Sequence, residues 1–318
     1  MDELVARMRS TLDPLGIDYE LIFVNDDSTD GSLEILKKYN AEDPRIKIVN
    51  MSRRFGHYPC ALAGFKCARG DAMVMISTDL QDPPELIPEM IEKFKAGADV
   101  VNTVRTKRLG ENPLKMWITK KAYQVINALS DIELPENMGD FKLLSRKVVN
   151  ELMNMKELDP YLRGIIRWIG FHQETVYYVR AARYSGKTHF PLLGKGPIQE
   201  FIRGVTAFSS APLYACLIYG FIISLLAFLY LIVVVTTKII GVNLPGWSAI
   251  MAAILFLGGN TLLTNGVLGL YIARMYDQIK ERPRYIISEK IGFEGDTKKK
   301  QMLVSWRKRK EKPVNPEV

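Results

Sequence analysis

Two kinds of apolar pattern alternate along the first part of the chain. Short apolar runs that end in acidic, amide or small residues are typical of buried parallel strands, and they occur at 20–27, 45–51, 71–77 and 99–104. Segments with the spacing of amphipathic helices lie between them, at 32–40, about 59–68 and 85–97. This order of strands and helices predicts an α/β fold with a doubly wound, mostly parallel sheet.

Two much longer apolar stretches follow, at about 213–240 and about 250–275. Each exceeds the ~20 residues that a helix needs to cross a bilayer. The short linker between them is nearly uncharged, whereas both outer flanks are rich in Lys and Arg, so both termini are expected in the cytoplasm. Small and amide residues such as Gly259 and Asn260 predict a helix-packing face, which favours a homo-oligomer through these helices. A pair of buried core helices is the alternative.

Composition agrees with a soluble domain joined to a membrane anchor, because 47% of the 318 residues are hydrophobic and 25% are charged. We expect a cytoplasmic domain at 1–200, a juxtamembrane segment at 201–212, two transmembrane helices at 213–275 and a basic cytoplasmic tail at 276–318. Much of the net charge of +8 lies in that tail, which favours contact with membrane lipid over nucleic acid. The predicted location is therefore the inner (plasma) membrane, which the chain crosses twice.

Acidic residues follow two of the predicted strands. Asp26 and Asp27 end the first, and Asp79 and Asp82 follow the third, so both pairs are expected at one cleft along the carboxyl edge of the sheet. Asp82 precedes Pro83, Pro84 and Glu85, which predicts that it caps the next helix. Asp79 lies before that cap, and its carboxylate could bind one hard cation together with the amide oxygen of Gln81.

Five motifs carry a resemblance to a known family: VNDDSTDGS (24–32), SRRFGHYPCALAGF (52–65), TDLQDPPE (78–85), GDFKLLSRKVV (139–149) and YLRGIIRWIGF (161–171). Their order resembles family-two glycosyltransferases of the polyprenyl-phosphate type, which include dolichol-phosphate mannosyltransferases and bactoprenol glucosyltransferases. The segment ARMYDQIKERPRYII (273–287) resembles the bactoprenol subgroup with two membrane spans in particular.

The resemblance implies a reaction and its partners. One sugar would pass from a nucleotide-sugar donor, with UDP-glucose favoured, to polyprenyl (undecaprenyl or bactoprenol) phosphate by an inverting single displacement. The product would be a lipid-linked sugar for cell-envelope glycosylation. The implied cofactor is a divalent metal, Mg²⁺ or Mn²⁺.

The resemblance also implies roles for individual residues. Asp79 and Asp140 would be catalytic, and Asp79 with Gln81 would bind the metal. The donor would contact Asp26, Asp27, Asp79 and Gln81. The acceptor or its phosphate would contact Arg105, Arg108, Lys142 and Arg183. For each basic residue, a solvated charge or a contact with anionic lipid is the alternative.

Several positions depart from the family pattern. Ser77 stands where the first acid of the D-x-D element often lies, and Lys142 replaces the more usual arginine. Asp140 is given no role as a general base, because a phosphate monoester has a second pKa of about 6 and is already ionised at pH 7. His57 is left out of the catalytic set, because a lone histidine is more often structural.

The two ends of the predicted cytoplasmic domain add two further expectations. Residues 113–130 mix aromatic and basic side chains, so this helix is expected either in the membrane interface or packed on the sheet. The family opens with an apolar strand, whereas MDELVARMRSTLDPLG (1–16) resembles the helix that follows that strand. This difference sustains an alternative function, an inactive membrane scaffold or partner subunit with the same fold.

Overall fold

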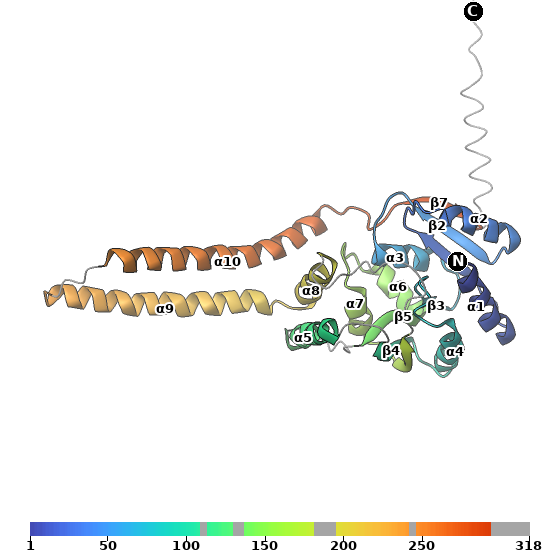
Figure 1. Cartoon of the computed structure of the whole chain (residues 1–318), viewed down its shortest axis with the longest axis horizontal. Helices are drawn as coiled ribbons and strands as arrows, with labels where there is room; N and C mark the ends of the chain where they lie inside the picture. The colour runs from blue at the N-terminus through green and yellow to red at the C-terminus, as the bar shows by residue number, and fades with distance from the viewer. Residues whose placement is uncertain (109–112, 130–136, 181–194, 242–245, 294–318) are drawn as a thin grey trace, which may run out of the picture. The chain divides into compact units, whose positions relative to one another are not determined.

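The computed structural model describes residues 1–108, 113–129, 137–180, 195–241 and 246–293. The chain forms two compact units (Figure 1). The sheet unit comprises residues 1–113, 135–188 and 283–318, and the helical unit comprises 114–134 and 189–282.

Seven strands in the described residues form two sheets, both within the sheet unit. The first has the order β1 (Leu21–Asn25), β2 (Ile46–Met51), β7 (Ile287–Ile291), with β1 and β2 parallel and β7 antiparallel to β2. The second has the order β3 (Ala72–Met75), β5 (Met138–Ser145), β4 (Val100–Arg108), β6 (Gln173–Arg180). Strand β5 is antiparallel to both neighbours, and β4 and β6 are parallel.

The helices of the sheet unit alternate with these strands. They are α1 (Asp2–Leu12), η1 (Asp13–Leu15), α2 (Ser32–Glu42), α3 (His57–Cys67), η2 (Pro84–Leu86), α4 (Ile87–Lys95), α6 (Arg146–Asn154) and α7 (Leu162–Trp168). The predicted α/β class and the predicted strands and helices of the first hundred residues are thus confirmed. The sheets are mixed, and no ladder joins β1 to β3 in the part of the chain that the structure describes.

One hydrophobic core joins the two sheets. Buried side chains from α1, β1, β2, α4 and β5 pack together, represented by Val5, Phe23, Ile48, Met90 and Phe141. Burial of each such side chain stabilises the fold by roughly 1.5–3 kcal/mol. The alternating burial along β1 explains why its sequence reads as a strand, since successive side chains point to opposite faces.

Strand β7 comes from the segment that the sequence analysis assigned to the basic tail. It returns to the sheet unit after the helical unit and pairs with β2, with Ile291 opposite Ile48. Part of the predicted tail is therefore a structural strand. The Lys- and Arg-rich cluster of the tail, at 298–312, lies outside the described residues.

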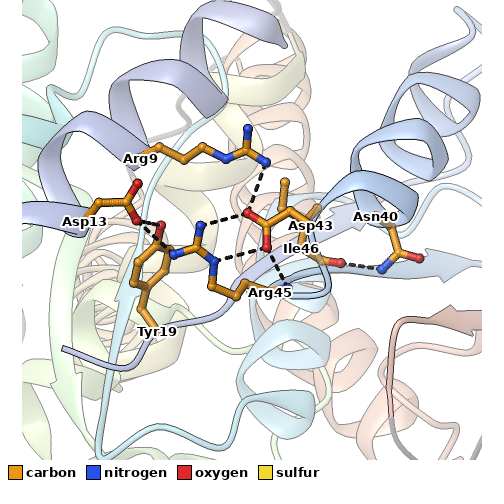
Figure 2. Close-up of polar contacts among 7 residues, drawn as sticks. All are labelled: Arg9, Asp13, Tyr19, Asn40, Asp43, Arg45 and Ile46. Carbon is orange, nitrogen blue, oxygen red and sulfur yellow. Dashed lines mark hydrogen bonds and ion pairs between the residues drawn. The ribbon is translucent and has the colours of Figure 1, made fainter. Parts of the chain in front are cut away.

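A polar network fastens the start of the chain to the turn before β2 (Figure 2). The Arg45 guanidinium donates to both carboxylate oxygens of Asp43, at 3.1 and 3.0 Å, and to Asp13 at 2.8 Å. Arg9 of α1 also donates to Asp43, at 3.0 Å, and the Tyr19 hydroxyl donates to Asp13 at 2.6 Å. The hydrogen bonds from Arg45 lower the pKa of Asp43 to about 2.

We expect this network to make stability depend on pH. A carboxyl whose pKa is lowered by folding stabilises the protein above its ordinary pKa of 3.8, and that contribution is lost as the pH falls towards 2. Asp43→Asn should lower the free energy of unfolding by ~1–2 kcal/mol at pH 7 and flatten its fall between pH 4 and 2. Denaturant unfolding of the detergent-solubilised chain measures both. Glu34→Gln, in an exposed pair with Lys37, is the control, and equal effects of the two changes would contradict the prediction.

The helical unit contains α5 (Pro113–Leu129), α8 (Lys195–Phe208), α9 (Ala211–Ile239) and α10 (Trp247–Ile279). Segments Ala211–Thr237 and Ala252–Ile279 are long and apolar enough to cross a membrane, and neither is buried within the protein. Helices α9 and α10 lie side by side (Figure 1), and the Tyr219 hydroxyl of α9 donates to Asn260 of α10 at 2.8 Å. Both long helices predicted from the sequence are thus present. Within the same unit, α5 packs against α8, because Ile126 contacts Gly204.

Candidate functional site

Most of the predicted site residues come together at one edge of the sheet unit. The loop after β3 carries Asp79 and Gln81, β4 carries Arg105 near its end, and the antiparallel strand β5 begins at the same edge. The register pairs Met75, the last residue of β3, with Lys142, so Asp140 lies beside the loop that follows β3. The antiparallel direction of β5 is what brings its first residues to the carboxyl ends of the other strands.

The two acids after β1 have different environments. The Asp26 carboxylate accepts the backbone N–H groups of Phe55 and Gly56, at 2.7 and 2.9 Å, and so fixes the loop that leads into α3. Gly56 has φ 96°, a conformation that favours glycine. Asp27 is exposed and has φ 51°, which is uncommon for a residue other than glycine. Donor binding by these two acids remains a prediction.

Asp140 is held by an arginine that the sequence analysis did not assign. Arg163 of α7 donates to both carboxylate oxygens of Asp140, at 2.7 and 2.6 Å. His57, the first residue of α3, has its Nε2 3.7 Å from the same carboxylate. Burial by itself raises the pKa of Asp140, but the Arg163 guanidinium outweighs that effect and holds the pKa well below its usual range. Asp140 is therefore a carboxylate at neutral pH and a weak base.

Lys142 lies two residues further along β5 and is fully buried. Among the residues that the structure describes, its Nζ makes one polar contact, with the sulfur of Met138 at 3.8 Å. Burial lowers the pKa of Lys142 to about 8, although the nearby Asp140 carboxylate opposes this shift. The structure thus holds a positive charge at the core of the site without a direct ion pair.

We expect Lys142 to destabilise the fold at neutral pH. A lysine whose pKa falls from 10.5 to about 8 on folding makes the protein less stable below pH 8 by about 3 kcal/mol, and this penalty disappears as the pH rises to 10.5. Lys142→Met should therefore raise the free energy of unfolding at pH 7 by ~1–3 kcal/mol. The difference between variant and wild type should shrink from pH 8 to 10.5.

Denaturant unfolding at several pH values measures this difference. Lys147→Met, on the exposed side of α6, is the matched control and should have little effect at any pH. A Lys142→Met protein that is less stable at pH 7 would contradict the expectation.

The loop after β3 presents the oxygen atoms proposed to bind the metal. The Asp79 Oδ1 accepts the backbone N–H of Gln81 at 3.2 Å, and Leu80 between them has φ 60°. The Gln81 side-chain oxygen accepts from Arg180 of β6 at 2.7 Å. No group of three or more His, Cys, Asp or Glu side chains in the described residues is arranged to hold a metal. A carboxylate and an amide oxygen are ligand types for a hard cation whose other ligands are phosphate oxygens of a bound substrate, and the Gln81 oxygen would then be shared between that cation and Arg180.

The predicted helix cap at Asp82 is wrong. Pro83 occupies the N-cap position of η2, and no side chain caps that helix. The Asp82 side chain is buried and accepts the Tyr178 hydroxyl of β6 at 2.6 Å, with the Arg105 guanidinium 3.6 Å away. Charge-assisted contacts with a hydroxyl and a nearby cation from β4 and β6 thus satisfy the Asp82 carboxylate in place of backbone N–H groups at a helix start.

The basic residues predicted to bind phosphate are placed differently from one another. Arg105 is largely buried, and its Nε donates to the Tyr178 hydroxyl at 3.0 Å. Arg108 is the last residue of β4, where its backbone pairs with Arg180. The side chain of Arg108, and Arg183 as a whole, lie outside the described residues.

Comparison with known proteins adds independent information. The sequence pattern of glycosyl transferase family 2 matches residues 2–153. The chain is 43% identical to the uncharacterized glycosyltransferase YkcC of Bacillus subtilis, over 92% of this chain and 90% of that protein. It is 40% identical to the uncharacterized glycosyltransferase sll0501 of Synechocystis, over 92% of each chain. It is 37% identical to the bactoprenol glucosyl transferase of Shigella phage SfII, over 85% of this chain and 87% of that protein.

Proposed function

Since the chain belongs to glycosyl transferase family 2 and is a glycosyltransferase, we propose that it transfers a single sugar from a nucleotide-sugar to a polyprenyl phosphate. UDP-glucose is the favoured donor, and undecaprenyl (bactoprenol) phosphate is the favoured acceptor. Support for the acceptor comes from relatives named bactoprenol glucosyl transferases that match 84–85% of this chain. The product would be a lipid-linked sugar for cell-envelope glycosylation.

The observation that carries this proposal is that two sets of polar residues, one after β3 and one at the start of β5, lie at the same edge of the sheet unit. Asp79 and Gln81 lie after β3, and Asp140 lies at the start of the neighbouring strand β5, where Arg163 holds it. If the donor diphosphate binds beside Asp79 and Gln81, the acceptor would bind next to it, beside Asp140. Two substrates that bind side by side in this way suit a direct displacement.

The proposed reaction is a single displacement that inverts the anomeric carbon. An ionised phosphate oxygen of the acceptor attacks that carbon, a new carbon–oxygen bond forms, and the bond to the nucleoside diphosphate breaks with its electron pair on the diphosphate. Because the attacking oxygen is already ionised at pH 7, Asp140 needs to accept no proton. Its low pKa agrees with a role in orienting a sugar hydroxyl or a cation.

Cationic groups would neutralise the negative charge that develops on the leaving nucleoside diphosphate. A divalent cation, Mg²⁺ or Mn²⁺, held by Asp79 and Gln81 would neutralise the charge that develops on the diphosphate. Asp26 and Asp27 are proposed on the donor side, where Asp26 already shapes the loop before α3. Arg105, Arg108, Lys142 and Arg183 are proposed to bind the lipid phosphate or the diphosphate.

We further propose that α9 and α10 span the inner membrane as a hairpin, with the sheet unit and both termini in the cytoplasm. Their length and apolar character support this arrangement. Cysteine labels at Asn243 and Val318, in a chain without its native cysteines, should react from opposite sides of the membrane. Reaction of both labels from one side would refute the hairpin.

Transfer of radiolabelled sugar tests the function directly. The purified full chain in detergent receives undecaprenyl phosphate, Mn²⁺ or Mg²⁺, and a panel of UDP- and GDP-sugars. One sugar per lipid should appear in the organic extract, and product should require the divalent metal. The alternative function is an inactive membrane scaffold or partner subunit, and absence of product with every donor would favour it.

A further inference from the structure

A triangle of buried polar side chains lies beneath the loop after β3. The Tyr178 hydroxyl of β6 donates to Asp82 at 2.6 Å and accepts from Arg105 at 3.0 Å, and the Arg105 Nη2 lies 3.6 Å from Asp82. The three residues come from three segments that are distant in sequence, namely the loop, β4 and β6. All three are at most 8% exposed, so solvent screens their interactions little.

The surrounding residues hold this triangle in one geometry. The Tyr178 ring packs edge-on against the buried Phe141 ring, with centroids 6.3 Å apart. A Cβ added at Gly139 would lie 2.8 Å from the Arg105 Nη2, so glycine at this position leaves the space that the guanidinium occupies. Burial raises the pKa of Tyr178 to about 12, so its hydroxyl keeps the proton that it donates.

The triangle anchors the loop that carries the donor-side residues. Asp82 follows directly after Gln81 and lies three residues after Asp79. Arg180, two residues after Tyr178 on the same strand, donates to Gln81 at 2.7 Å. Two side chains of β6 therefore hold two successive loop residues. The loop needs such anchors, because Leu80 has φ 60°, a conformation that is strained for a leucine.

We propose that Tyr178 is a positioning residue for sugar transfer, whose hydroxyl fixes the loop of residues 79–82 so that Asp79 and Gln81 meet the donor diphosphate in a single geometry. This inference rests on the proposed function for its catalytic consequence. Its structural part, the anchoring of the loop, is independent of that function. Tyr178 touches neither the donor nor the acceptor in this proposal and acts through Asp82.

The first test compares Tyr178→Phe with Tyr177→Phe. The two tyrosines are adjacent on β6, but Tyr177 is 67% exposed, so the same atom is removed from a buried and an exposed site. Hydrogen exchange should become faster in Tyr178→Phe within the peptide covering residues 76–86. It should not change in peptides of α2 and β2, which report on the fold as a whole. Unchanged exchange in the loop peptide would overturn the proposal, whether or not the protein is active.

The second test measures the catalytic consequence. Tyr178→Phe should lower kcat about 10-fold or more and raise the Mn²⁺ and donor concentrations needed for half-maximal rate. The KM for undecaprenyl phosphate should change less, because Arg105 keeps its ion pair with Asp82. Tyr177→Phe should behave as wild type. A simple loss of folded protein would lower the rate without moving the metal or donor dependence. Equal changes in donor and acceptor KM, or wild-type kinetics in Tyr178→Phe, would overturn the positioning role.

A double-mutant cycle completes the design. Asp82→Ala removes the oxygen that accepts the Tyr178 hydroxyl, and the double variant Asp82→Ala/Tyr178→Phe should be no slower than the slower single variant, because both changes break the same Tyr178–Asp82 hydrogen bond. Independent, multiplicative losses would contradict action through Asp82. If the wild-type chain transfers no sugar from any donor, the proposed function fails. The exchange experiment then still decides whether Tyr178 anchors the loop.

Discussion

Asp79→Asn should reduce sugar transfer ~100-fold or more while leaving the fold unchanged. The substitution keeps an oxygen that can accept the N–H of Gln81, as Asp79 Oδ1 does now at 3.2 Å, so the loop loses its charge and not its shape. That charge is proposed to hold the cation that faces the leaving diphosphate. Loss of it therefore affects the transition state more than the binding of the acceptor.

Transfer of radiolabelled sugar into lipid extract measures the loss. Asp71→Asn is the matched control, because Asp71 is exposed at the opposite end of β3. It should retain wild-type turnover. Wild-type turnover in Asp79→Asn would instead remove Asp79 from the catalytic set. A greatly lowered affinity for the acceptor would show that Asp79 acts on the acceptor and not on the donor diphosphate.

Arg163→Met should be the most destabilising single change at the site. It leaves the largely buried Asp140 carboxylate without the guanidinium that now donates to both of its oxygens, a loss of ~2–4 kcal/mol. The pKa of Asp140 should rise. Because the pair lowers that pKa in the folded state, its contribution is present above the ordinary pKa of 3.8 and is lost as the pH falls below it.

Denaturant unfolding at pH 7 and pH 3 tests this expectation. Arg167→Met, on the same helix but exposed, is the control and should cost little. The double variant Asp140→Asn/Arg163→Met should recover part of the lost stability, because it buries no unpaired charge. If Arg163→Met and Arg167→Met were equally stable at pH 7, the bidentate pair would contribute nothing measurable.

Local sequence pattern predicted the order of helices and strands but not the direction of every strand. Strands β1 to β4 were predicted from apolar runs because each is buried at alternate or successive positions. Strand β5 contains a buried lysine and a glycine, and its antiparallel direction depends on pairing with β3 and β4, which no local pattern encodes. Strand β7 is short and partly charged, and only its pairing with β2 makes it a strand.

The site shows the same division between local and tertiary information. Asp79 and Gln81 were found because their spacing on one loop is a local feature. Asp82 was misassigned because its neighbours form a strong local capping signal, which contacts from β4 and β6 override. Arg163 and Tyr178 were missed because each acts through a residue distant in sequence. Their signal was weak, namely one of two arginines in an otherwise apolar helix and a tyrosine at an inward position of a strand.

The return of the chain to β2 has a practical consequence for producing a water-soluble form. A protein that simply stops after α8 would lack β7, and the outer edge of β2 would then be exposed to solvent and to other molecules. Such a product is expected to aggregate even though every residue of the proposed site is present. A soluble enzyme should instead join the end of α8 to residue 283 through a flexible linker, so that the helical hairpin is excised and the last strand is kept.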